Sequence, residues 1–295
     1  MNQIKIEISN QYDGMTIKEF LKSFNIGRSQ IETIRNSKMV ELNNQLVNLD
    51  VVIKKGDQLS FGIKEKIDFE PWFINLDIVY EDDYILIVNK PSKMLIHPDE
   101  STNQKTLVNA VSGYYYEHKI FRNVRYAHRI DFDTSGIVIF AKDFLTLGKL
   151  NKLIETHQLK RYYLALCENK FKNKEGTINL AIGRDRHHNN KFRVGDSSQS
   201  KEAITHYEVV KEYGKYSLVK LLLETGRTHQ IRVHMSHINH PLLGDELYGG
   251  KTNLINRVSL HSYEVKFIHP ITNQFVDVIC SLPIDMEGLM VKRND

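Results

Sequence analysis

Apolar and polar residues alternate in short stretches along the first 65 residues. The strand-like stretches are IKIEI, MVEL, LVNLD and QLSFGI, and the helical ones are TIKEFLKSF (16–24) and RSQIETIRN (28–36). Thr16 and Ser29 are residue types that cap the first turn of a helix, and Gly27 separates the two helical stretches. The pattern predicts a small α+β domain over residues 1–65.

From about residue 74 the chain changes to longer β segments. LDIVY and YILIVNKP flank an acidic turn and predict a hairpin, while residues 106–118 and 144–158 have helical patterns. The other strand-like stretches are GIVIFAK, RYYLALC, AITHYEVV, YSLVKLLLE, VSLHSYEVKF and QFVDVIC. Many strands with few helices between them predict an α+β fold, with helices flanking a mixed, largely antiparallel sheet. The absence of regular βαβ alternation argues against a Rossmann fold.

A charged stretch, KEKIDFEPW (64–72), separates the two patterns and is interrupted by Pro71. We therefore expect a linker over residues 66–75 and a second domain over 76–295. A chain of 295 residues is long enough for one large domain and one small one.

Composition narrows the class of protein but not its function. No apolar run approaches the roughly 18 to 20 residues of a membrane span, and the N-terminal residues are too polar for a signal peptide. Two cysteines exclude a disulfide framework and a four-cysteine zinc site, so we expect a protein of the reducing cytoplasm. The net charge of +4 conceals an excess of Lys and Arg over residues 142–220. This stretch could face phosphates, or its lysines could simply keep the surface soluble.

The segment HRIDFDTSGIVIFAK (128–142) places a polar cluster directly before an apolar strand. A rigid scaffold commonly presents a catalytic group in this way, although Asp, Thr, Ser and Gly also form ordinary turns. Asp131 and Asp133 invite comparison with a glycosidase pair, because side chains two apart in an extended segment lie roughly 6.5 to 7 Å apart. Paired glycosidase carboxylates usually come from separate elements, so this interpretation is weak.

A second polar cluster, ETGRTHQIRVHMSHINHPLLGDELYGG (224–250), follows a predicted strand. Thr228 is placed to cap a short helix that begins near His229. Arg232 suits a different task, because a guanidinium within about 4 to 6 Å keeps a catalytic carboxylate ionised and oriented. The spacing does not show which carboxylate Arg232 meets.

Three histidines in the same segment, His234, His237 and His240, recur every third residue and raise the question of a metal site. Steps of three residues drift around a helix, and the HExxH pattern is absent. Packed or solvated histidines explain the pattern better than a metal does.

Together these segments resemble the RluA family of pseudouridine synthases. The resemblance is carried by HRIDFDTSG and Ala141-Lys142, by VNKPSKMLIHP (88–98), by RYYLALC (161–167) and by TGRTHQIRVHMSHINHPLLGDELYG (225–249). IGRD (182–185), KFRV (191–194) and Ala203-x-Thr205-x-Tyr207 fit the middle region of the family. Residues 1–65 are similar to the small "S-four" RNA-binding domain of ribosomal proteins, through Gly27-Arg28-Ser29 and Gly56-Asp57.

The resemblance implies the pseudouridine synthase fold and an enzyme that detaches uracil from C1′ of a uridine in RNA and rejoins it through C5. It makes Asp131 the catalytic aspartate, either as a nucleophile at C1′ or as a base toward a sugar proton. It makes Arg232 the basic partner of that aspartate and Tyr163 the active-site tyrosine, which stacks on uracil and serves proton removal from C5. Ile231 would form an apolar wall, and Arg129 would fill the space that the flipped uridine leaves.

Further expectations concern binding and partners. Arg227, His229 and Gln230 lie in the matching motif and are expected to bind substrate. The reaction needs no cofactor, and we expect no metal. We expect a cytoplasmic monomer that acts on structured RNA, with ribosomal RNA as the first candidate and transfer RNA as the second, and without a membrane. The alternative is a non-catalytic RNA-binding or ribosome-assembly protein on the same fold.

Overall fold

A four-stranded antiparallel sheet and two helices form the N-terminal domain in the computed structural model, which describes residues 2–63, 65–99, 105–186, 188, 190–195 and 197–291. The sheet has the order β1-β4-β2-β3, and the elements are β1 (Asn2–Glu7), η1 (Asn10–Tyr12), α1 (Ile17–Ser23), α2 (Arg28–Ser37), β2 (Val40–Leu42), β3 (Gln45–Leu46) and β4 (Gln58–Ile63). Both predicted helices are confirmed. Thr16 caps α1 and forms a reciprocal capping box with Glu19. The prediction that Ser29 caps α2 is wrong, because extended backbone at Gly27 already begins the helix at Arg28.

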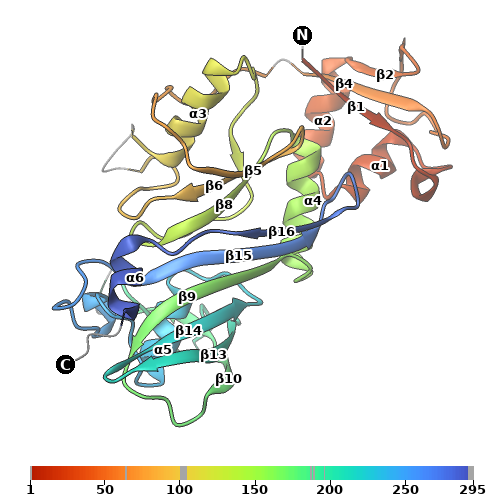
Figure 1. Ribbon diagram of the computed structural model, residues 1–295. Helices are drawn as coiled ribbons and strands as arrows, with labels where there is room; N and C mark the ends of the chain where they lie inside the picture. Colours follow the sequence, from red (N-terminus) through yellow and green to blue (C-terminus); the bar gives the residue numbers. More distant parts are fainter. Residues whose placement is uncertain are drawn as a thin grey trace.

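The large domain is built on one mixed sheet with the order β10-β13-β14-β9-β15-β8-β6-β5, as Figure 1 shows. β16 pairs with β15, and β7 pairs with β8. Its strands are β5 (Ile78–Glu81), β6 (Ile85–Lys90), β7 (Arg125–Tyr126), β8 (Ser135–Ala141), β9 (Lys160–Glu168), β10 (Glu175–Asn179), β13 (Ile204–Tyr213), β14 (Tyr216–Leu223), β15 (Leu260–Ile268) and β16 (Phe275–Ile279). Among its described pairs only β8 with β15 is parallel, so the expected mixed, largely antiparallel sheet is confirmed.

Helices α3 (Leu107–Glu117) and α4 (Phe144–Glu155) pack on opposite faces of β6 and β8. Alternate side chains of a strand point to opposite faces, which sorts the apolar residues of these strands into two sets. Leu86 and Val138 pack with α3, whereas Ile87 and Ile139 pack with α4. Both helices were predicted from sequence, although α4 ends at Glu155 and not at residue 158.

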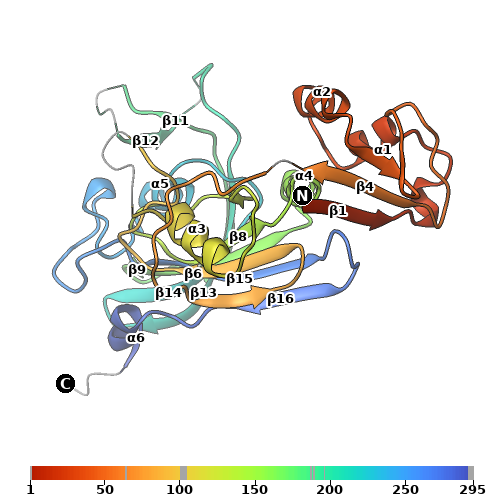
Figure 2. The same cartoon turned by 90° about the horizontal axis from the view of Figure 1, so that it is seen from above.

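The N-terminal domain docks on α4, as Figures 1 and 2 show. Phe144 belongs to the core of the small domain and meets the ring of Phe61 edge-on at 5.9 Å. Gly148 allows the closest approach, since a Cβ there would lie 2.0 Å from the carbonyl oxygen of Phe24. The ammonium group of Lys149 lies 4.2 Å from the centre of the Phe24 ring. The two domains therefore share a packed interface.

The predicted linker has no helix or strand within its described residues, yet it lies against the large domain. The carboxylate of Asp68 accepts from the backbone N–H of Val124 at 2.9 Å, and the backbone N–H of Trp72 donates to the carbonyl of Asn109 at 2.9 Å. A Cβ on Gly113 would collide with the carbonyl of Trp72, so α3 approaches the linker closely there. These contacts support a proposed division into an N-terminal domain (1–65), a linker (66–75) and a large domain (76–295). The linker is held against the large domain.

Five smaller elements complete the described chain. The hairpin of β11 (Ile182–Arg184) and β12 (Phe192–Val194) stands apart from the large sheet, and α5 (Gln230–His237) follows β14. The 3-10 helix η2 (Glu246–Tyr248) lies close to α5, and α6 (Ile284–Met290) ends the described chain. Within the described residues, none of the helices is long and apolar enough to cross a membrane.

Candidate active site

A cavity of about 710 Å³ opens where segments distant in sequence meet. Most of its lining comes from the loop 127–134 before β8, the start of β9, and the segment 223–232 that leads from β14 into α5. Residues 95–99, the end of α4 and Leu260 complete it. The sheet aligns the three main segments, because Tyr163 on β9 pairs with Leu221 of β14 on one side and Ser262 of β15 on the other. The cavity thus joins both polar clusters that the sequence singles out.

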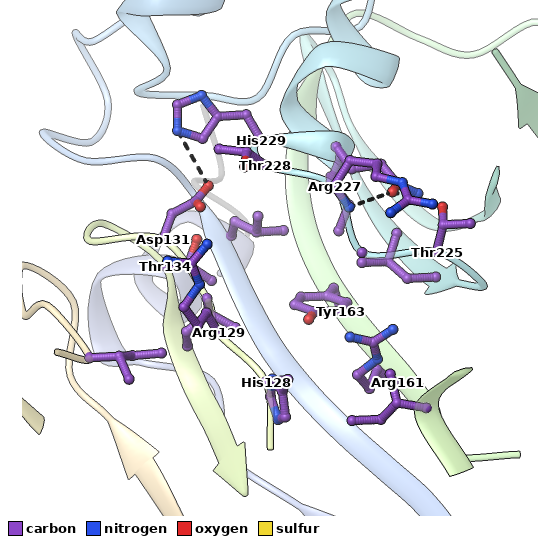
Figure 3. Close-up of a pocket in the computed structure, with 18 of the residues that line it drawn as sticks. His128, Arg129, Asp131, Thr134, Arg161, Tyr163, Thr225, Arg227, Thr228 and His229 are labelled. Carbon is purple, nitrogen blue, oxygen red and sulfur yellow. Dashed lines mark hydrogen bonds and ion pairs between the residues drawn. The ribbon is translucent and has the colours of Figure 1, made fainter. Parts of the chain in front are cut away.

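Asp131 lies in a turn, with the N–H of Thr134 donating to its carbonyl at 3.1 Å. Its side chain is 28% exposed, and its carboxylate lies 3.5 Å from Nη1 of Arg232 and 3.9 Å from Nε2 of His229 (Figure 3). Lys90 is fully buried, and its ammonium group supports the loop by donating to the carbonyl of Phe132 at 3.2 Å. The structure therefore brings Asp131 and Arg232 together, as the resemblance implies.

Arg232 is held in place by a second carboxylate that the sequence reasoning missed. Asp245 accepts from Nε of Arg232 at 2.8 Å and from Nη2 at 2.9 Å, and the guanidinium also lies 5.0 Å from the ring of Tyr248. Burial opposes the charge, but these hydrogen bonds and the charge of Asp245 raise the pKa of Arg232. Asp245 lies in a glycine-rich stretch, where a single acid is easily interpreted as a turn residue. The available sequence signal for Asp245 was Arg232 in the same motif, an arginine with which it can pair.

His229 begins α5 in the left-handed conformation, with φ of 57°, so the prediction that Thr228 caps this helix is wrong. Its Nδ1 bonds with the hydroxyl of Tyr248 at 3.0 Å, which turns Nε2 toward Asp131. Burial lowers the pKa of His229, while the charge of Asp131 acts in the opposite direction. A strained residue at a helix start is often found at a functional site.

Gln230 is buried, and both ends of its side chain are engaged within the protein. Its oxygen accepts from the hydroxyl of Thr225 and the N–H of Arg227, and its amide nitrogen donates to Ile204 and Thr205. An amide group offers two donors and about two acceptors, so no capacity remains for a ligand. Gln230 therefore shapes the loop 224–229.

The other expected site residues divide between the interior of the cavity and its rim. Tyr163 and Ile231 are almost completely buried in the cavity wall, and burial raises the pKa of Tyr163. Arg129 and Arg227 are exposed: Arg129 bonds with His97, and Nε of Arg227 donates to the carbonyl of Glu202 at 2.8 Å. Both rim arginines keep guanidinium nitrogens for other partners.

The three histidines spaced by three have separate surroundings, and His237 is exposed. His234 is fully buried and bonds with Thr205 and the carbonyl of Leu180, and His240 stacks on Phe171 at 3.6 Å. Among the residues that the structure describes, no group of three or more His, Cys, Asp and Glu side chains could hold a metal ion.

Both domains of this chain are similar to domains of known proteins. Residues 84–237 match the RNA pseudouridylate synthase family, and residues 4–59 match the RluD ribosomal pseudouridine synthase N-terminal domain. The chain is 39% identical to the uncharacterized RNA pseudouridine synthase YhcT of Bacillus subtilis, over 98% of each chain. It is 30% identical to ribosomal large subunit pseudouridine synthase D of Haemophilus influenzae, over 98% of this chain and 93% of that one. The solved structure of human RNA pseudouridylate synthase domain containing 1 has 28% identity and a TM-score of 0.60, and the match covers 75% of this chain and 90% of that one.

Proposed function

Because this chain belongs to the RNA pseudouridylate synthase family and isomerises uridine in RNA, we propose that Asp131 is the carboxylate that detaches the base. The observation that carries the proposal is the 3.5 Å approach of Arg232 to Asp131 inside a cavity that Tyr163 also lines. Attack on C1′ and removal of a sugar proton both begin from an ionised carboxylate. Arg232, fixed by Asp245, supplies the positive charge that orients this carboxylate.

Uracil must leave the RNA stack to reach Asp131, at a cost of about a few kcal/mol. In this proposal Tyr163 and Ile231 form the walls that the ring contacts once it is flipped. Arg129 and Arg227 stand exposed at the rim, where Arg129 fills the vacated space and Arg227 meets the phosphate backbone. His229 orients Asp131, and Gln230 holds the loop that carries Arg227.

The substrate we propose is ribosomal RNA, with transfer RNA as the alternative. Support comes from the small domain, which matches an N-terminal domain of ribosomal pseudouridine synthases, and from the relative named for the large ribosomal subunit. The packed interface on α4 would let the small domain bind RNA at a fixed position relative to the cavity. We further propose that the protein acts as a monomer in the cytoplasm, which light scattering and cell fractionation would test.

The decisive test incubates the protein with unmodified ribosomal and transfer RNA and maps pseudouridine. Wild type should form it, and Asp131→Asn should not, while RNA binding remains intact. Asp133→Asn is the matched control, because its carboxylate lies in the same loop. Full activity of Asp131→Asn would refute its role, and RNA binding by wild type without turnover would favour the non-catalytic alternative.

A further inference from the structure

Arg161 is a buried cation in the cavity wall that has none of the usual partners of such a group. The residue is 5% exposed, and its Nε is buried without a hydrogen-bond acceptor. Within the described residues, its guanidinium takes part in no hydrogen bond or ion pair. A buried charge is normally paired, and one left unpaired in a native structure calls for an explanation.

Three of the four acidic residues that line the same cavity, all but Asp99, are paired with other groups. Glu224 bonds with His206 at 2.7 Å, Glu155 lies 3.5 Å from Lys152, and Asp131 pairs with Arg232. His128 adds no second charge, because burial, aided by the charge of Arg161, lowers its pKa to about 3. Arg161 therefore presents an unneutralised positive charge to this part of the cavity.

The position of Arg161 shows which part of the substrate it can reach. Arg161 and Tyr163 are two residues apart on β9, so their side chains share a face of the sheet. Figure 3 shows the guanidinium beside Tyr163, and its Nη1 lies against Gly226, 3.4 Å from where a Cβ there would stand. A ring in contact with Tyr163 would have its edge within reach of this guanidinium. A phosphate of the same nucleotide would stay near the exposed rim arginines.

We propose that Arg161 is a catalytic residue that donates hydrogen bonds to a carbonyl oxygen of the flipped uracil and stabilises the uracil anion. This inference rests on the proposed function of the cavity. When the C1′–N1 bond breaks toward the base, its electron pair stays on N1 and spreads to O2 and O4, while the sugar either bonds through C1′ to the Asp131 carboxylate or loses a proton from C2′ to it. C5 then attacks C1′, which releases the carboxylate or takes the proton back at C2′. The C5 proton leaves to a base, and N1 regains a proton. A guanidinium has only donors, so it favours the anion over the neutral ring.

Two other roles for Arg161 predict different measurements. If it bound a phosphate, its loss would weaken RNA binding and reduce the dependence of binding on salt. If it acted only by lowering the pKa of Tyr163, its loss would slow removal of the C5 proton. Stabilisation of the anion predicts slower cleavage of the C1′–N1 bond. RNA binding, its salt dependence and the removal of the C5 proton should not change.

The experiment measures single-turnover pseudouridine formation by the full chain with saturating enzyme, using RNA with hydrogen or deuterium at C5 of the target uridine. Arg161→Gln should react about 100-fold more slowly or worse, the typical loss when one donor to a developing oxyanion is removed. RNA affinity and its salt slope should equal those of wild type. The rate of Arg161→Gln should show no isotope effect at C5. Arg161→Lys should recover part of the lost rate.

Lys160→Gln is the matched control, because it removes the same charge from the neighbouring residue on the other face of β9. Thermal unfolding checks that Arg161→Gln is folded; if it is not, Arg161→Lys carries the comparison through its rate and isotope effect. A wild-type rate in Arg161→Gln, a several-fold isotope effect, or a lowered salt slope would each overturn the assignment. Failure of the proposed function would look different, since wild type itself would then form no pseudouridine.

Discussion

Replacing Asp245 with alanine tests how far the cavity depends on the carboxylate behind Arg232. The side chains of Asp245 and Arg232 are 1% and 8% exposed and share two hydrogen bonds. Removing one partner of a buried pair takes away the hydrogen bonds that the other charge relies on and costs about 3 to 5 kcal/mol. Asp245→Ala should therefore lower the free energy of unfolding by about this amount, measured by denaturant titration.

The same substitution should lower activity for a separate reason. Once Asp245 is gone, Arg232 is free to turn fully to Asp131, now 3.5 Å away. At this distance two unit charges attract by about 5 kcal/mol with an effective dielectric constant near 20. If this attraction stabilised Asp131 before the reaction by about 3 kcal/mol more than in the transition state, the reaction would be roughly 100-fold slower. Single-turnover pseudouridine formation measures the loss.

Two further variants make this prediction refutable. Glu246→Gln removes a neighbouring charge that is exposed, so its stability and rate should match those of wild type. The double variant Arg232→Met/Asp245→Leu removes the whole pair and should regain much of the stability, but not the activity. If Asp245→Ala were as stable and as active as Glu246→Gln, the supporting role of Asp245 would be wrong.

Three other predictions follow from separate parts of the molecule. Gly148→Val should displace the small domain, because its Cβ would lie 2.0 Å from the carbonyl of Phe24, and small-angle scattering should show a larger radius of gyration. His128 has a pKa of about 3 in the fold against 6.5 as its ordinary value, so the unfolded chain binds the proton first as pH falls. Stability should drop by about 1.4 kcal/mol per pH unit from this group between pH 6.5 and 3, and His128→Asn should lack that component in denaturant titrations. Arg227→Gln should reduce the slope of log affinity against log salt by about 0.9 if it contacts one phosphate, while an unchanged slope would exclude that contact.

Local pattern was sufficient to predict most of the fold. Alternating apolar residues in β6 and β8, and the helical spacing of α3 and α4, are signals contained in single segments. The cap of α2 was missed because Gly27 and Ser29 are both acceptable at a helix start, and the choice depends on backbone geometry.

The site was predictable only where a resemblance linked distant segments. The approach of Asp131 to Arg232 followed from that resemblance, whereas Asp245 and Arg161 have roles that only their surroundings reveal. Charge counting was less informative still. The basic stretch 142–220 includes Lys142 and Lys220, which form ion pairs with acidic residues at 2.7 and 2.8 Å. The charges of these two lysines are therefore neutralised within the protein.

The place of β15 in the sheet has a consequence for the order in which the chain can fold during synthesis. This strand lies between β8, which follows the Asp131 loop, and β9, which carries Tyr163, yet it comes after both in sequence. Until the ribosome has released residues 260–268, the two halves of the large sheet lack the strand that joins them. The hairpin of β5 and β6 and the β13–β14 pair can form earlier, because their contacts are local. A nascent chain that stalls before residue 260 would hold both halves of the cavity without their alignment, so activity is acquired only after residues 260–268 have emerged.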